Sequence, residues 1–447
     1  DLGRSWRSIA GDLPKGTIVW AIQQDHVRPE LLFLGTEFGI YFSPNRGTNW
    51  FKLNGAVPTI SFRDLKLQRR DNDLVGASFG RGIYILDDYS PLREIAAGAL
   101  AQEGALFPVR DAWWYVPSQL SQAPGRPEKG SDDYTADNPP FGALLTYYLR
   151  QAPTTAREAR QATEKVLREQ GVDVPFPGFD RLREEALESG PKVLLIVSDG
   201  TGRKVRWIEG PASAGLHRVN WDLRGPDPNP VDLSPPGFQP PWDAPSHGPL
   251  TAPGRYSAEL VVVSASGVRR LGTAQSFDVK PVPNALAGTD FVAVAAFQQQ
   301  TAELKRRVAG AGAEISRVGE QLRHMRAALV QTPRADPGLF TRMDSVTRSL
   351  AALETRLKGD RARQRLDEST TPSISDRVDQ VISGHWETRQ MPTATQRRDI
   401  EIATGAFEEL ARELTALIDG DLARLEADLE AAGAPWTPGR RPQWRQE

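Results

Sequence analysis

The stretch Ser43-Pro44-Asn45-Arg46-Gly47-Thr48-Asn49-Trp50 decides how the first part of this chain folds. Gly47 permits the positive φ that a tight turn requires. The Asn45 side chain can hydrogen-bond to nearby backbone, as in an Asx turn, and the Trp50 ring offers a large apolar surface for burial between sheets. The stretch therefore predicts a compact hairpin with structural rather than chemical roles. The positions given such a role are Ser43, Asn45, Gly47, Thr48 and Trp50.

This hairpin resembles the Asp-box, the Ser-x-Asp-x-Gly-x-Thr-Trp motif of β-propeller blades, with Asn45 where Asp is usual. A partial second copy, Asp1-Leu2-Gly3-Arg4-Ser5-Trp6, stands at the start of the sequence. Gly3 and Gly47 are separated by the length of one four-stranded blade, roughly 40–45 residues. We therefore expect the chain to begin inside a blade and to carry only the last part of a propeller.

Short apolar runs alternate with Gly-rich turns throughout residues 1–93, as strands at propeller spacing do. Residues 35–41 are similar to residues 76–84, which carry two additional residues. This repeat indicates about two consecutive blades. Two blades alone leave unpaired strand edges and uncovered apolar faces, so we expect residues 1–93 to require further blades for stability.

Residues 94–136 are expected to form a connector, which the aromatic run Trp113-Trp114-Tyr115 pins to a neighbouring domain. Strand patterns return in residues 137–283, with a charged helical insertion at about 154–189. The sequence Asp199-Gly200-Thr201-Gly202 is typical of a hairpin turn. Several short strands with turns between them predict a β-sandwich of immunoglobulin or fibronectin type.

The apolar spacing becomes helical in residues 284–432, where apolar residues recur in steps of three and four. One run of such apolar positions ends before Thr332-Pro333, and a second run begins after these two residues. A third run changes register near Gly420. Three amphipathic helices of coiled-coil character predict an antiparallel bundle. Their apolar faces pack either within the chain or against a second copy or partner, because small residues such as Ala309 and Ala313 allow close approach.

Two further segments have distinct compositions. The polar link at about 367–396 is expected to connect the second and third helices, with Trp386 as an anchor. Residues 433–447 contain Pro435, Pro438 and Pro442 and are expected to form a loose tail.

The composition limits the classes of function. The chain has 447 residues, which predicts two to four domains. Lys and Arg total 55 against 57 for Asp and Glu, whereas a nucleic-acid-binding surface normally needs a basic excess. The absence of Cys excludes disulfides and thiolate chemistry within the chain. No apolar run is long enough for a membrane span, and the first residues do not form a signal peptide.

Five stretches of the sequence resemble a bacterial family whose members carry sortilin-like BNR-repeat propellers, then an immunoglobulin-like domain and a helical segment. The stretches are the Asp-box and residues 80–93, 138–143, 214–224 and 253–256. Members are often labelled glycosyl hydrolases through the BNR repeats alone. The resemblance implies a secreted or periplasmic protein, and the helical insertion departs from the family pattern.

Glycoside hydrolysis requires two carboxyl groups facing across a cleft. The candidates in the propeller part are Glu37, Asp64, Asp87 and Asp88. Asp87 and Asp88 follow the last strand, where a turn or capping role is expected. A sialidase-type site needs an arginine cluster and a tyrosine nucleophile. Arg81 and Tyr84 are instead expected to be a surface arginine and a packed tyrosine.

No metal or cofactor site is expected. The histidines lack the spacing of a zinc site; they are His26, His217, His247, His324 and His385. The segment Asp132-Asp133-Tyr134-Thr135-Ala136-Asp137 lacks the full EF-hand pattern. A P-loop and a Gly-x-Ser-x-Gly elbow are also absent from the sequence. We therefore predict no catalytic, cofactor-binding or metal-binding residue in this chain.

These observations lead to three hypotheses about function. The first is a non-catalytic binding or scaffold protein that recognises peptide or glycan through its propeller. The alternative is a glycoside hydrolase whose catalytic carboxylates lie in missing upstream blades. A third is an assembly factor that acts through residues 286–432. Nucleic acid and a membrane span are excluded as expected partners.

Overall fold

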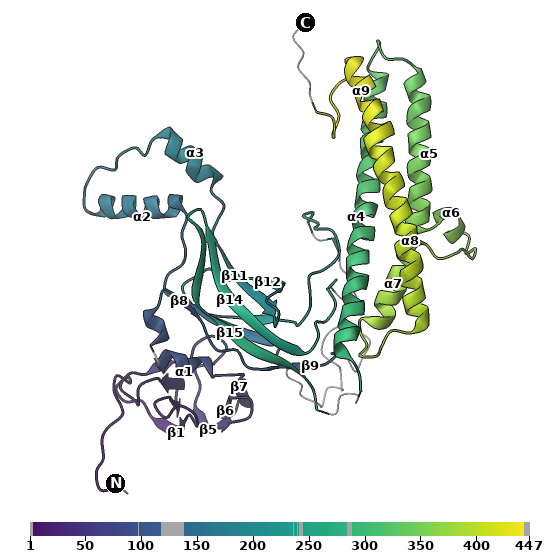
Figure 1. Cartoon of the computed structure of the whole chain (residues 1–447). Coiled ribbons are helices and arrows are strands. Elements are labelled where there is room, and N and C mark those ends of the chain that lie inside the picture. The colour runs from purple at the N-terminus through teal and green to yellow at the C-terminus, as the bar shows by residue number, and fades with distance from the viewer. Residues whose placement is uncertain are drawn as a thin grey trace. The chain divides into compact units, whose positions relative to one another are not determined.

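The structure is a computed structural model that describes residues 3–96, 98–117, 138–235, 237–238, 240, 245–283 and 288–441. These residues form a mixed β and α fold with several sheets and a C-terminal set of helices (Figure 1). They divide into two compact units. The first unit is Asp1–Trp114, Thr135–Leu223 and Pro253–Val282, and the second is Tyr115–Tyr134, Arg224–Ala252 and Pro283–Glu447.

The first unit begins with two antiparallel meanders. One contains β1 (Val19–Gln24), β2 (Leu32–Thr36), β3 (Gly39–Ser43) and β4 (Phe51–Lys52), and the other contains β5 (Phe62–Gln68), β6 (Asp73–Ser78) and β7 (Ile83–Leu86). Alternate side chains of both sheets meet in one core, which includes Phe33, Ile40, Phe62, Leu65 and Leu74. The meanders therefore bury one face of each sheet against the other.

Gly35 allows this close packing. A Cβ atom at this position would lie 2.7 Å from the carbonyl oxygen of Phe62 on the facing sheet. Any larger residue would push the two sheets apart or displace the Phe62 backbone. The glycine in the repeat of residues 35–41 thus serves packing between sheets.

The rest of the first unit contains two further sheets. The three-stranded sheet has the order β13–β10–β8, from β8 (Gly104–Leu106), β10 (Ala143–Leu149) and β13 (Gly215–Trp221). The five-stranded sheet has the order β12–β11–β14–β15–β9, from β9 (Ala112–Trp114), β11 (Lys192–Asp199), β12 (Lys204–Gly210), β14 (Gly254–Ser264) and β15 (Gly267–Pro281). The long strands β14 and β15 bend, so this sheet is curled into a half-barrel (Figure 1).

Aromatic side chains fill the space inside the curled sheet. The ring of Trp221 on β13 lies 5.1 Å from that of Tyr256 on β14 and 6.2 Å from that of Phe277 on β15. Trp221 is almost completely buried. Trp221 therefore belongs to the inward face of β13.

Two strands lie in the segment expected to be a connector. β8 pairs with β10, and β9 pairs in parallel with β15. Each has only three residues, too few for a periodic pattern to be recognised in sequence. Trp114 is buried on β9 whereas Trp113 is largely exposed, so only one of these two tryptophans anchors the segment.

The helical insertion forms α2 (Ala156–Glu169) and α3 (Phe179–Leu187). Thr155 and Glu158 form a capping box that begins α2. Arg160 on α2 donates from Nη2 to Glu185 on α3 at 2.8 Å, which links the two helices. Helical structure was the prediction for residues 154–189, and these two elements lie within that range.

The second unit is mainly helical. Its long helices are α4 (Phe291–Val330), α5 (Gly338–Lys358) and α8 (Ala394–Ala416), which continues through the π-helix η2 (Leu417–Leu422) into α9 (Ala423–Ala431). These helices run side by side (Figure 1) around a shared apolar core. The register slip expected near Gly420 is this π-helical turn, which inserts extra backbone into the helix.

Two segments of the second unit contain structure that their composition did not indicate. The link at 367–396 contains α7 (Ile374–His385), which Ser373 and Asp376 begin with a capping box. The expected tail is partly folded, because Arg440 is 5% exposed and bonds to Glu430. The polar composition of both segments concealed these contacts. Trp386 is buried, as expected of an anchor, and its Nε1 donates to Thr301 at 2.9 Å.

Three short helices complete the described structure: α1 (Pro91–Ala96), η1 (Ala99–Ala101) and α6 (Arg361–Gln364). Across the ranges described, none of the helices combines the length and the apolar character that crossing a membrane would demand.

Candidate functional site: an acidic cluster with arginines

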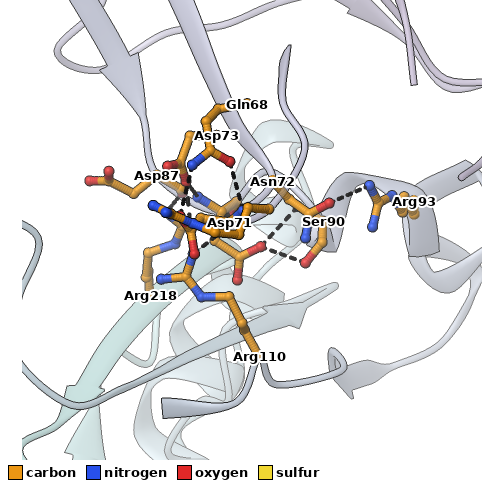
Figure 2. Close-up of polar contacts among 11 residues, drawn as sticks. Gln68, Asp71, Asn72, Asp73, Asp87, Ser90, Arg93, Arg110 and Arg218 are labelled. Carbon is orange, nitrogen blue, oxygen red and sulfur yellow. Dashed lines mark hydrogen bonds and ion pairs between the residues drawn. The ribbon is translucent and has the colours of Figure 1, made fainter. Parts of the chain in front are cut away.

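A polar region of the first unit lies where β6 begins and β7 has just ended (Figure 2). The two strands are antiparallel and Leu74 pairs with Leu86. The residues that precede Leu74 therefore lie beside the residues that follow Leu86. This register brings the turn between β5 and β6 next to the turn that follows β7. We call the four carboxylates gathered there the acidic cluster: Asp71, Asp73, Asp87 and Asp88.

Hydrogen bonds fix the two turns to each other. The Asp88 amide donates to Asp73 Oδ1 at 2.9 Å, and the Tyr89 amide donates to the Asn72 carbonyl at 2.8 Å. Asn72 and Asp88 have φ values of 58° and 43°, a left-handed conformation that Asn and Asp adopt more readily than other side chains. Ser90 Oγ donates to Asp88 Oδ1 at 2.6 Å. Asp88 therefore has the turn role expected from the sequence.

Arg93 connects this region to a buried carboxylate on the loop after β1. Its Nε and Nη2 donate to Asp25 Oδ2 and Oδ1, both at 2.8 Å, and Nη2 also donates to Asn72 Oδ1 at 2.7 Å. The Tyr89 hydroxyl donates to Asp25 Oδ1 at 2.7 Å. Burial alone would raise the pKa of Asp25, but the hydrogen bonds from Arg93 and Tyr89 lower it to about 2.

Arg218 reaches the cluster from β13. Its Nη1 donates to the Asp87 carbonyl at 2.7 Å and its Nη2 to the Asp88 carbonyl at 2.8 Å. Arg110 donates from Nη1 to the Asp71 carbonyl at 2.7 Å and lies 3.8 Å from Asp73 Oδ1. The guanidinium donors of both arginines thus meet main-chain oxygens of the turns (Figure 2).

Asp87 differs from the other members of the cluster. Its carboxylate is half-buried and accepts no hydrogen bond within the described part of the chain. Burial and then the negative charge of Asp73 raise its pKa, although Arg218 and Arg110 partly offset this effect. A carboxyl group with a raised pKa beside a second carboxylate is a feature that acid catalysts share.

The other residues considered for glycoside chemistry do not join this cluster. Glu37 lies in the turn between β2 and β3, and Asp64 is on β5, 3.5 Å from Lys66 Nζ. Arg81 is exposed in the turn between β6 and β7, and Tyr84 packs edge-on against Phe62 with ring centres 5.6 Å apart. Only Asp87 and Asp88 of the four proposed carboxylates are brought together.

The histidines lie apart and have protein partners or solvent around them. Within the described residues, no group of three or more His, Asp or Glu side chains is placed to hold a metal ion. His385 is buried, its Nε2 lies 3.0 Å from the Gln390 carbonyl, and burial lowers its pKa. His324 is exposed on α4. The calcium loop considered at residues 132–137 lies outside the described residues.

The Asp-box forms a hairpin with the contacts that its residue types allow. Gly47 has φ 83°, and its amide donates to Ser43 Oγ at 2.8 Å. Asn45 Oδ1 accepts from the Asn49 amide at 2.8 Å, and Thr48 Oγ1 donates to the Asn45 carbonyl at 3.0 Å. These bonds close the turn on itself and leave its polar atoms occupied.

The aromatic end of the box is buried whereas the partial copy is not. Trp50 is 7% exposed and its Nε1 donates to the Ile9 carbonyl at 2.9 Å. Trp6, the counterpart in the partial copy, is 92% exposed. The described residues of the partial copy thus lack the burial that characterises the complete box.

Sequence reasoning missed Asp25, Tyr89 and Arg218 as members of a connected polar network. Arg93 and Arg218 lie in residues 80–93 and 214–224, two of the stretches that carry the family resemblance. That resemblance was the only signal, because the partners are far apart along the chain.

Comparisons with known proteins identify no family. No family model and no curated protein matches the chain. Among solved structures, two matches are the extracellular domains of the putative one component system BT4673 and the putative hybrid two component system BT4673, both from B. thetaiotaomicron. Their TM-scores are 0.14 and 0.13 at 11% and 9% identity. Each match covers 60% of this chain and 26% of the other, so the chain spans about a quarter of their length. A likeness at this level carries no argument about function.

Proposed function

We propose that this chain is part of a non-catalytic binding or scaffold protein, in which the acidic cluster holds sheet modules together. The observation that carries this proposal is the direction of the arginine donors. Arg218 and Arg110 donate to main-chain carbonyls, and Arg93 donates to Asp25 and Asn72. Guanidinium groups bonded in this way connect elements of the first unit.

We further propose that the two meanders are blades of a β-propeller of the sortilin-like BNR-repeat type. Each meander has an apolar outer face in addition to the face that it buries. Ile22 on β1 is 49% exposed, and Ile83 and Ile85 on β7 are 69% and 60% exposed. In a propeller, neighbouring blades would cover the exposed outer face of each meander, in the same way as the two meanders cover each other's inner faces.

A cavity beside β1 supports the same proposal. It has a volume of about 630 Å³ and an aliphatic lining that includes Ile9, Leu13, Ile22 and Leu34, next to Trp50 of the Asp-box. In a complete propeller this space would be filled by the adjoining blade. Peptide or glycan recognition then falls to the assembled propeller, and the sandwich, which we propose to be immunoglobulin-like, supports it. A secreted or periplasmic location follows from the family resemblance.

The alternative function is glycoside hydrolysis, and the raised pKa of Asp87 beside Asp73 is the observation that favours it. In this alternative, catalytic carboxylates from further blades would complete the site. The two functions predict different results with a panel of polysaccharides and peptides. A binding protein retains ligands on an array without releasing reducing ends, whereas a hydrolase releases them.

A matched pair of variants separates the two functions. Asp87→Asn removes the carboxyl group with the raised pKa, and Asp64→Asn removes an exposed carboxylate of the same meander. Ligand retention without reducing-end release in all three proteins supports the binding function. Release that is lost only in Asp87→Asn would establish the hydrolase.

A further inference from the structure

A polar cavity lies in the second unit between α4, the π-helix η2, α9 and the loop that follows α9. Its volume is about 430 Å³. Ile418 and Leu422 of η2 form part of its apolar lining. The polar lining consists of Arg317, Gln321, Glu426, Glu430, Arg440 and Arg441.

The loop after α9 contains two buried polar atoms that lack a hydrogen-bond partner. Four such side-chain atoms occur in the described residues, and two of them are Thr437 Oγ1 and Arg440 Nε. Thr437 is 3% exposed. The other nitrogens of Arg440 donate to the Pro435 carbonyl at 2.8 Å and to Glu430. Buried polar groups are nearly always satisfied, so two such atoms make this loop unusual, and Arg440 is also part of the cavity lining.

The charges around the cavity favour an anion. Arg317 is paired with Glu314, and Arg440 is paired with Glu430. Arg441 is exposed and makes no ion pair within the described residues. Glu426 accepts from Gln321, and burial raises the pKa of this carboxyl group. The cavity lining itself contains three arginines and two glutamates, and Arg441 is the arginine for which the described residues provide no ion pair.

The backbone is shaped to bring these groups together. Gly439 has φ 94°, and a Cβ atom there would lie 2.4 Å from Gln321 Nε2. The positive φ favours glycine at this position, and the two residues that follow, Arg440 and Arg441, both line the cavity. The π-helical turn on the opposite wall is a form of backbone that occurs frequently at functional sites.

We propose that this cavity binds a small ligand through an oxyanion, either a phosphate or a carboxylate group, with Arg441 as the donor and the other two arginines of the lining adding positive charge. The N–H groups of the Arg441 guanidinium match the acceptor-only oxygens of such a group. The inference concerns the helical unit and is independent of the function proposed for the sheets.

Titration calorimetry of the full chain tests this inference with inorganic phosphate and with acetate as probes, at an ionic strength held constant with chloride. We expect saturable binding of at least one probe, and the tighter of the two identifies the group. Arg441→Gln should weaken the Kd about tenfold, because loss of a charge-assisted hydrogen bond is worth roughly that factor. Arg398→Gln is the matched control, since Arg398 is exposed on α8 and outside the cavity lining.

A second pair of variants tests the cavity itself. Ala427 is exposed and lines the cavity, so Ala427→Phe should occupy the space and abolish probe binding without affecting the core. Ala352→Phe places the same ring at an exposed position of α5 outside the cavity and should leave binding unchanged. Absence of saturable binding, or equal losses in the control variants, would overturn the inference.

Discussion

Asp25 and Arg93 are 68 residues apart in the chain and form a two-point ion pair, with both oxygen–nitrogen distances at 2.8 Å. The Asp25 side chain is fully buried and that of Arg93 is 13% exposed. The pair fixes the loop after β1 to α1, and Tyr89 adds a third donor to the carboxylate. The pair is therefore a buried contact between the loop after β1 and the helix that follows the second meander.

Removal of one partner should strongly destabilise the first unit. We expect Arg93→Met to lower the free energy of unfolding by about 3–5 kcal/mol, because it leaves the Asp25 charge buried without its partner. Urea unfolding followed by tryptophan fluorescence measures the loss. Arg70→Met, which removes an exposed arginine that pairs with Asp71, should change stability by less than about 1 kcal/mol. Equal effects of the two substitutions would contradict a special role for the buried pair.

The same pair predicts how stability depends on pH. The pKa of Asp25 is about 2 in the folded chain, below its ordinary value of 3.8. Its stabilising contribution is therefore fully present above about pH 4 and is lost as the pH falls towards 2. Unfolding curves measured across this range should decline more steeply for the unmodified chain than for Asp25→Asn. Parallel pH profiles of stability for the two proteins would show that Asp25 does not stay ionised in the folded chain as the pH falls below about 4.

Asp87 should behave in the opposite way. Because its pKa is raised in the folded chain, its ionised form opposes folding at neutral pH. Asp87→Asn should therefore raise the thermal unfolding midpoint at pH 7, and this gain should shrink as acid protonates the carboxyl group of the unmodified chain. Asp64→Asn, at an exposed position, should give no gain. A loss of stability in Asp87→Asn would mean that the carboxylate is held by favourable contacts.

Arg218 should protect the turn that follows β7 from local opening. Its two hydrogen bonds reach the carbonyls of Asp87 and Asp88, so Arg218→Gln should accelerate amide hydrogen exchange at Tyr89. The expected loss of stability is about 1–2 kcal/mol, because the arginine is partly exposed to solvent. Arg203→Gln serves as the control, since Arg203 pairs only with its own hairpin at Asp199. Unchanged exchange at Tyr89 would exclude this role.

Packing between the meanders can be tested at Gly35. Gly35→Ala should cost about 1–3 kcal/mol through the clash with the Phe62 carbonyl. Gly190→Ala adds the same methyl group where no other atom lies within 4 Å, and it should change stability by less than about 0.5 kcal/mol. Urea unfolding curves of the two variants measure the loss in the free energy of unfolding. Similar losses in both variants would contradict close contact of the sheets at Gly35.

The parts of the fold that the sequence could predict are those with a local signal. The helical periods predicted α4, α5 and α8, and the slip near Gly420 predicted an irregularity where η2 lies. The strands β8 and β9 have three residues each, too short to show a period. Helix α7 was missed because its polar composition outweighed the capping signal at Ser373.

The polar network could not be predicted for a different reason. Several of its contacts join residues far apart in the chain, 68 positions between Asp25 and Arg93 and 131 between Asp87 and Arg218. No local pattern specifies such a pairing, because the register of whole sheets decides it. Asp88 was an exception, since a residue directly after a strand is itself a turn signal.

The non-catalytic binding function is tested most directly by two measurements on the unmodified protein and on Asp87→Asn. The first is reducing-end release from a panel of polysaccharides, and the second is ligand retention on glycan and peptide arrays. We predict retention of a ligand by both proteins and release by neither. Release by the unmodified protein that disappears in Asp87→Asn would contradict the non-catalytic function and assign the acidic cluster to catalysis.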